Sequence, residues 1–116
     1  MREDLFHVKN TMNNPKEIID YLCDELIEKG LATQSYKEDV FRREAVSATS
    51  FVNGFAVPHS IEVSANESCI STLILDKPVI WGGFEVKLII LLAIRETDNH
   101  LLKIFFDWLS SCILYT

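Results

Sequence analysis

Apolar residues at every third or fourth position predict two helices in the first part of the chain. Asn14 and Pro15 suit the start of the first helix, and Gly30 suits its end. Ser35 and Glu38 form a Ser-x-x-Glu capping box that predicts the start of the second. The apolar positions of the first helix fall on one face and are Ile18, Ile19, Leu22, Cys23, Leu26 and Ile27. A short turn joins the two, so we expect a helical hairpin.

The pattern then changes from helical spacing to strand-like runs. Residues 49–57 are rich in β-forming residues and are interrupted by Asn53-Gly54, a turn signal. Residues 69–75 predict a strand that Lys77-Pro78 breaks. Residues 86–94 are almost continuously apolar, which is typical of a strand covered on both faces.

The remaining signals lie at the two ends and at one turn. Residues 5–8 predict a short first strand, and Trp81-Gly82-Gly83 predicts a turn. Thr97 or Asp98 suits the cap of a last helix, in which residues 101–113 form a broad apolar surface. That surface packs either on the sheet or on a second subunit, as in a homodimer. Helices, then strands, then a helix predict an α/β layered domain with helices on both faces of a sheet.

Composition and charge narrow the class of protein. The 116 residues suit one domain, 1–116, and the formal net charge is -6. Arg42-Arg43 is the only basic cluster, so direct binding of nucleic acid by this domain is not expected. The longest apolar run is strand-sized and the N-terminus lacks an apolar signal core. We therefore expect no membrane contact and a cytoplasmic location.

His59 is the strongest candidate for chemistry. It follows Pro58 at the end of an apolar strand-like run, and sites gather at strand ends in α/β sheets. A neutral imidazole is nucleophilic near pH 7 and forms an N–P bond labile enough to pass a phosphoryl group on. The phosphoryl charge then needs a guanidinium, a second histidine or backbone N–H groups. The chain offers Arg43, His100 and the Asn53-Gly54 loop for this purpose.

The residues around His59 also form a long motif. They are Arg43-Glu44, Thr49, Asn53-Gly54 and Ala56-Val57-Pro58-His59. This series resembles the RE…T…nG-x-A-[IV]-P-H signature of the fructose/mannitol class of enzyme IIA in the bacterial sugar phosphotransferase system. The segment from His100 to Leu109 is similar to the H-x(3)-[IL]-x(4)-L segment of that family. The resemblance runs from about residue 5 to the end of the chain.

The resemblance implies a three-layer α/β/α sandwich with a mixed sheet. Domains of this family run on for another helix or two, so it also implies that the sequence is C-terminally truncated at Thr116. His59 matches the histidine that accepts a phosphoryl group from the phosphocarrier protein HPr and passes it to a cysteine of enzyme IIB. His100 matches the second active-site histidine, and Arg43 matches the arginine that steadies the site. No metal or organic cofactor is expected.

Two functions remain open on this resemblance. One is a phosphohistidine carrier in sugar uptake. The other is a regulatory module in a sugar-responsive transcription regulator or antiterminator, whose other domains belong to the same full-length chain. Flanking sequence would separate them, since regulators carry nucleic-acid-binding domains and transporters lie beside enzymes IIB and IIC.

A third function, a Cys–His hydrolase, has little support in the sequence. It needs a reactive thiol near His59, and Cys69 lies in an apolar run without an oxyanion motif. Cys23 and Cys112 also stand in apolar stretches, so we interpret all three cysteines as core residues. Without the motif, Arg43 would be interpreted as a helix charge paired with Asp39, Glu44 as a surface acid or helix-end partner, and His7 as a strand or surface residue.

Overall fold

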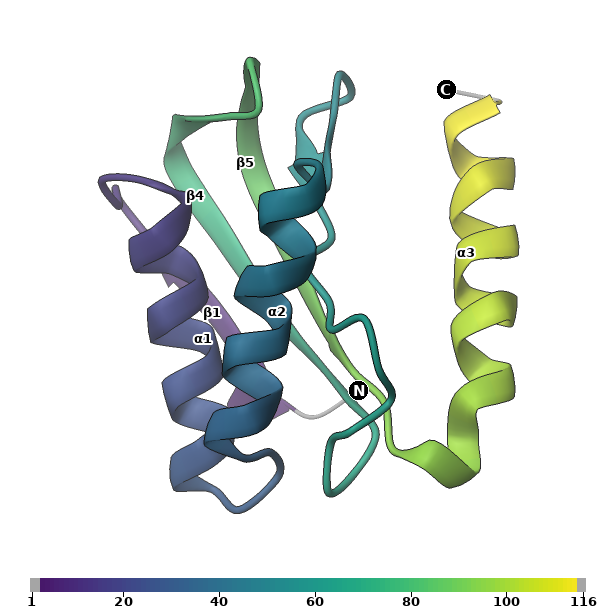
Figure 1. Ribbon diagram of the computed structural model, residues 1–116. Coiled ribbons are helices and arrows are strands. Elements are labelled where there is room, and N and C mark those ends of the chain that lie inside the picture. Colours follow the sequence, from purple (N-terminus) through teal and green to yellow (C-terminus); the bar gives the residue numbers. More distant parts are fainter. Residues whose placement is uncertain (1–2, 115–116) are drawn as a thin grey trace.

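A mixed five-stranded sheet forms the centre of the molecule in a computed structural model, which describes residues 3–114 and side chains up to Ser111 (Figure 1). The strands are ordered β1-β4-β5-β3-β2. The pairs β1–β4 and β3–β5 are parallel, whereas β4–β5 and β2–β3 are antiparallel. The elements are η1 (Glu3–Leu5), β1 (Phe6–Lys9), α1 (Pro15–Glu28), α2 (Gln34–Val46), β2 (Ser50–Phe51), β3 (Phe55–Ala56), β4 (Cys69–Trp81), β5 (Phe84–Ala93), η2 (Glu96–Asp98) and α3 (Asn99–Leu114).

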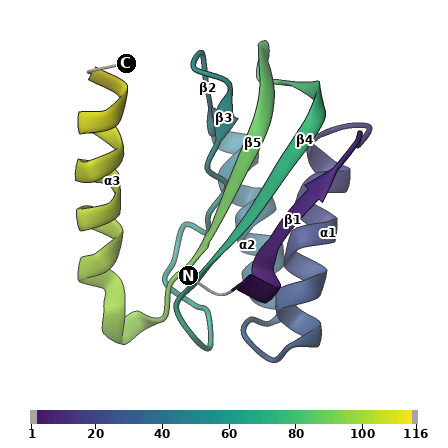
Figure 2. The same ribbon diagram turned by 180° about the vertical axis from the view of Figure 1, so that it is seen from behind.

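Alternate residues of β5 face two separate cores. Ile89 and Leu91 join the larger core, which lies under α1 and α2. Ile90 and Leu92 join a smaller core with Leu109 of α3. Figures 1 and 2 show α1 and α2 side by side against one face of the sheet, and α3 standing apart from them. This arrangement confirms the predicted α/β/α sandwich and the predicted covering of β5 on both faces.

The helical hairpin is confirmed, but the start of its second helix was predicted two residues too late. In α1 the Asn14 side chain accepts a hydrogen bond from the Glu17 N–H at 2.8 Å, as expected of the cap. In α2 the cap is Thr33, whose hydroxyl accepts from the Tyr36 N–H at 3.3 Å. Thr33 has an extended backbone, whereas Ser35 already lies inside the helix. The Ser-x-x-Glu pattern was therefore misleading here.

The prediction that Lys77-Pro78 breaks the strand was wrong. Strand β4 continues through this pair to Trp81. The pairing of β4 with β5 shifts register between Ile74 and Val79, so Pro78 stands where the ladder is interrupted. A proline has no N–H to donate, and such an irregularity is one of the places where a strand tolerates it.

The last helix begins directly after Asp98, one of the two caps predicted for it. Residues 96–98 form the short helix η2, and α3 begins at Asn99. The Asp98 carboxylate accepts hydrogen bonds from the Ser68 hydroxyl at 2.7 Å and from Arg95 Nε at 2.6 Å. It therefore ties η2 to the start of β4. At the other end of the chain, the predicted first strand is confirmed as β1, one residue further on.

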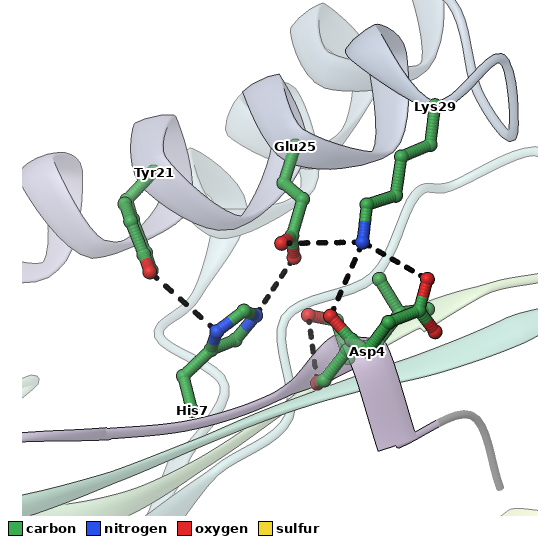
Figure 3. A network of polar contacts seen from close by, with 7 residues as sticks. Asp4, His7, Tyr21, Glu25 and Lys29 are labelled. Atoms are coloured by element: carbon green, nitrogen blue, oxygen red, sulfur yellow. Dashed lines mark hydrogen bonds and ion pairs between the residues drawn. The ribbon is translucent and has the colours of Figure 1, made fainter.

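A polar network fixes the edge strand β1 to α1 (Figure 3). His7 Nε2 lies 2.7 Å from Glu25 Oε1, and the carboxylate only accepts, so Nε2–H donates. The Tyr21 hydroxyl lies 3.5 Å from His7 Nδ1. Lys29 joins Glu25, at 3.6 Å, to Asp4, at 2.9 Å. Both ring nitrogens of His7 thus have partners, and we interpret this histidine as structural.

The face of the sheet under α3 is only partly covered. An apolar groove of about 660 Å³ lies between α3 and the sheet. Ile104 and Trp108 line it and are 59% and 57% exposed. By contrast, Cys23 is buried in the larger core, as expected, and Trp81 is buried there too. Cys112, also predicted to be a core residue, has its side chain outside those the structure describes. Within residues 3–114 no helix is long and apolar enough to cross a membrane.

The turn between β4 and β5 supplies a stability test. Gly82 and Gly83 both have positive φ, 56° and 89°. A Cβ on Gly82 would lie 2.4 Å from Ala48 Cβ, whereas a Cβ on Gly83 would meet no atom within 4 Å. We expect Gly83→Ala to lower the free energy of unfolding by about 1–3 kcal/mol through backbone strain alone. Gly82→Ala should lower it further, as measured by urea denaturation. Equal losses in the two variants would contradict the predicted packing of the turn on Ala48.

Candidate functional site

His59 is held against the edge of β5 just beyond the end of β3. The Leu92 N–H donates to the Pro58 carbonyl at 3.1 Å, and His59 forms a single parallel bridge with Leu92. Pro58 has no N–H, so its carbonyl makes the contact with β5. The His59 side chain is half-buried. The end of the strand therefore presents the imidazole beside the sheet, as the sequence predicted.

The environment of His59 favours a neutral ring with Nε2 as the nucleophile. Nδ1 lies 2.8 Å from the Val57 carbonyl oxygen, which only accepts, so Nδ1 carries the proton and Nε2 keeps its lone pair. Burial is the main cause that lowers the pKa of His59 below its usual 6.5, and the charge of Arg43 lowers it further. The hydrogen bond to Val57 and the charge of Glu44 oppose this shift. At neutral pH the ring is therefore uncharged and able to attack an electrophile.

A small cavity of about 240 Å³ opens beside the His59 ring. It is lined by Arg43, Ala48, Thr49, Ser50, Phe51, Val57, His59 and Phe106. The sequence-predicted residues Arg43 and His59 thus meet here. Arg43 donates one N–H to the Ser47 carbonyl at 2.8 Å, and a guanidinium has five. The alternative pairing of Arg43 with Asp39 was wrong, because Arg42 makes that ion pair at 3.1 Å.

Arg43 is the cation among the described residues that line this cavity. The two hydroxyls in the lining donate elsewhere: Thr49 to Glu44 at 2.7 Å, and Ser50 to the Trp81 carbonyl at 2.7 Å. A phosphoryl group in the cavity would therefore meet the guanidinium as its charged donor. A charge-assisted hydrogen bond of this kind contributes about 1.5–3 kcal/mol.

Helix α3 contributes an aromatic ring to the cavity. Phe106 stands edge-on to His59, with ring centroids 5.2 Å apart. His100, the other predicted histidine, lies exposed in the first turn of α3 and is not among the residues that line the cavity. The Asn53-Gly54 turn is also outside this lining, and its Gly54 N–H donates to the Phe51 carbonyl at 3.1 Å. Of the three groups predicted to stabilise a phosphoryl charge, only Arg43 thus lines the described cavity with His59, whereas His100 and the Asn53-Gly54 turn do not.

Two acidic residues of α2 organise the segments around His59, and their roles were missed in the sequence. Glu44 accepts hydrogen bonds from Thr49 and Trp81, so it is more than a helix-end partner. The buried Asp39 carboxylate accepts from the Glu62 N–H at 2.8 Å and so holds the loop that follows His59. The place of Glu44 next to Arg43 in the motif could have indicated its role at the site. No sequence signal indicated the roles of Asp39 and Phe106.

The two described cysteines are remote from the His59 cavity. Cys69 lines the apolar groove under α3 and is absent from the lining around His59. Burial raises the pKa of the Cys23 thiol to about 12, which removes it as a nucleophile. The described geometry therefore gives no support to a Cys–His hydrolase.

Comparison with known proteins gives a consistent result. Residues 1–114 match the family model described as "Phosphoenolpyruvate-dependent sugar phosphotransferase system, EIIA 2". The chain is 34% identical over 95 residues to the mannitol-specific phosphotransferase enzyme IIA component of Halalkalibacterium halodurans, covering 79% of this chain and 66% of that protein. It is 33% identical over 94 residues to the transcriptional regulator ManR of Bacillus subtilis, covering 81% of this chain and 14% of ManR.

A solved structure shows the same fold. It is the complex of enzyme IIAMTL with phosphorylated enzyme IIBMTL from Escherichia coli, at a TM-score of 0.80 and 16% identity. The match covers 97% of this chain and 81% of that one. This chain therefore spans only part of the proteins that it resembles.

The electrostatics of His59 can be tested by NMR titration of its ring protons. We expect Arg43→Ala to raise the pKa of His59, because it removes a cation that disfavours the imidazolium. Arg42→Ala is the matched control, since Arg42 pairs with Asp39 and should leave that pKa unchanged. An equal rise of the His59 pKa in both variants would contradict a direct effect of the Arg43 charge on the imidazole.

Proposed function

Because the chain belongs to the EIIA 2 family of the phosphoenolpyruvate-dependent sugar phosphotransferase system, we propose that it is a cytoplasmic phosphoryl carrier with His59 as the acceptor. The observation that carries this assignment is the hydrogen bond from His59 Nδ1 to the Val57 carbonyl. It leaves Nε2 with a lone pair beside a cavity that Arg43 also lines. No residue is required to bind sugar, since the cargo is the phosphoryl group.

The proposed reaction is a transfer between two ring nitrogens. The Nε2 lone pair attacks the phosphorus of phosphohistidine on HPr, and the electron pair of the broken N–P bond stays on the donor nitrogen. The loaded His59 ring keeps its Nδ1 proton and becomes positively charged, and the Val57 carbonyl stabilises that charge. Arg43 binds the phosphoryl oxygens. In the onward step a cysteine thiolate of enzyme IIB attacks the phosphorus, and the electron pair returns to Nε2.

The proposed partners are HPr and an enzyme IIB. Support for the second comes from the solved complex of a IIA with phosphorylated IIB, whose IIA fold this chain shares. His100 is proposed as an accessory group on the strength of its motif alone, because it lies outside the described cavity.

The second candidate function is a phosphorylation-sensing module of a transcription regulator. It is favoured by the match to ManR, in which the matched region is 14% of the protein. In that setting the same His59 chemistry would report sugar availability, and the readout would be another domain of the full-length chain. Flanking sequence that encodes nucleic-acid-binding domains would select this function.

The phosphoryl carrier is tested by incubation with enzyme I, HPr and radiolabelled phosphoenolpyruvate. We expect acid-labile, base-stable label on the wild-type chain and none on His59→Ala, because only His59 Nε2 accepts the group. Folding of His59→Ala is checked by circular dichroism. His7→Ala serves as a histidine control and should keep its label, since His7 lies in the network with Glu25.

The outcomes of this labelling separate three cases. Label that survives His59→Ala would overturn the acceptor assignment. A folded wild-type chain that takes no label would overturn the carrier function. Loss of rate in His100→Ala would support the accessory role, and an unchanged rate would remove His100 from the site.

A further inference from the structure

Glu44 lies next to the His59 cavity but does not line it. It stands near the end of α2 and is half-buried. Its Oε2 accepts from the Thr49 N–H at 2.8 Å, and its Oε1 accepts from the Thr49 hydroxyl at 2.7 Å. Both carboxylate oxygens therefore hold one residue, the one that precedes β2.

Thr49 passes this constraint to the segment that carries His59. Its carbonyl accepts from the Val57 N–H at 3.0 Å, and the Val57 carbonyl in turn accepts from His59 Nδ1 at 2.8 Å. Val57 precedes Pro58, which restricts it to extended backbone. With its N–H held by Thr49 and its backbone restricted, the direction of the Val57 carbonyl is fixed.

A third contact keeps the Glu44 carboxylate in place. Trp81 Nε1 donates to Oε2 at 2.9 Å, and the Trp81 side chain is fully buried in the larger core. This contact leads away from His59, toward the turn between β4 and β5. The carboxylate is thus held by the core on one side and by the site segment on the other.

The geometry points to Glu44 as a positioning residue for His59, acting through Thr49 and Val57 to keep the ring proton on Nδ1 and Nε2 open for the phosphoryl group. The role of Nε2 in this inference rests on the proposed function. The physical need is clear, because an Nε2–H tautomer would have no lone pair on the nitrogen that faces away from Val57. Without a fixed acceptor at Nδ1, both tautomers would be populated.

Two substitutions of Glu44 separate position from charge. Glu44→Gln keeps the shape of the side chain, and its amide can still bond Thr49 and Trp81 once the Thr49 hydroxyl turns. Glu44→Ala removes all three contacts. Glu38→Ala is the matched control, an exposed acid on the same helix. Of the three contacts of Glu44, Trp81→Phe removes only the one that leads into the core, and it also leaves a cavity there.

The readouts are the His59 tautomer, from the nitrogen-15 shifts of its ring, and the rate of labelling by enzyme I, HPr and phosphoenolpyruvate. We expect a single Nδ1–H tautomer in wild type, Glu38→Ala, Glu44→Gln and Trp81→Phe, the last with reduced stability. Glu44→Ala should show a mixture of tautomers and label on the order of 10- to 100-fold more slowly. Glu44→Gln should also lower the pKa of His59, because the anion that favours its imidazolium is gone.

Failure of this inference is distinct from failure of the carrier function. A folded Glu44→Ala chain with the wild-type tautomer and rate would overturn the positioning role. If Glu44→Ala does not fold, Glu44→Asp takes its place, since the shorter side chain withdraws the carboxylate from the Thr49 N–H and hydroxyl while keeping its charge. A wild-type tautomer in that variant would likewise overturn it. A wild-type chain that takes no label contradicts the carrier function, whereas the tautomers still decide the role of Glu44.

Discussion

The burial of β5 is the constraint on which the rest of the structure depends. Both faces of this strand are apolar, so helices have to cover both, and every backbone polar group on its edges needs a partner. On one edge β4 supplies the partners over almost the whole length. On the other edge β3 is only two residues long, and the Pro58 carbonyl continues the pairing at Leu92. His59 is thus positioned by the part of the β5 edge that β3 is too short to pair with.

Helix α2 fixes the same region from the opposite side. Its Tyr36 hydroxyl donates to the Leu92 carbonyl at 2.5 Å, on the strand residue that also binds Pro58. Asp39 holds the loop after His59, and Glu44 holds the segment before it. Arg43 comes from the same helix and lines the cavity. One helix therefore sets the backbone on both sides of His59 and also supplies the cation.

The sequence predicted those parts that depend on local signals. The caps and turns at Asn14 and Gly54, the continuous apolar run of β5 and the Pro-His step each carry their own physical cause within a few residues. The path of β4 through Pro78 was not predictable in this way, because it depends on a register shift against a partner strand. The place of His100 depends on where α3 packs, and no local pattern encodes that. Arg43 and His59 were found together only because a long motif connects residues that are 16 positions apart.

The hydrogen bond from His59 to Val57 has a consequence for the proposed transfer of a phosphoryl group. In the proposed cycle the hydrogen bond from Nδ1 to Val57 would serve the phosphorylated ring as well as the free ring, so neither the tautomer nor the ring orientation would have to change. In the proposed carrier, each transfer would then need little rearrangement of the His59 ring, whichever way the phosphoryl group moves. The same site would be suited to taking the group up and to giving it away.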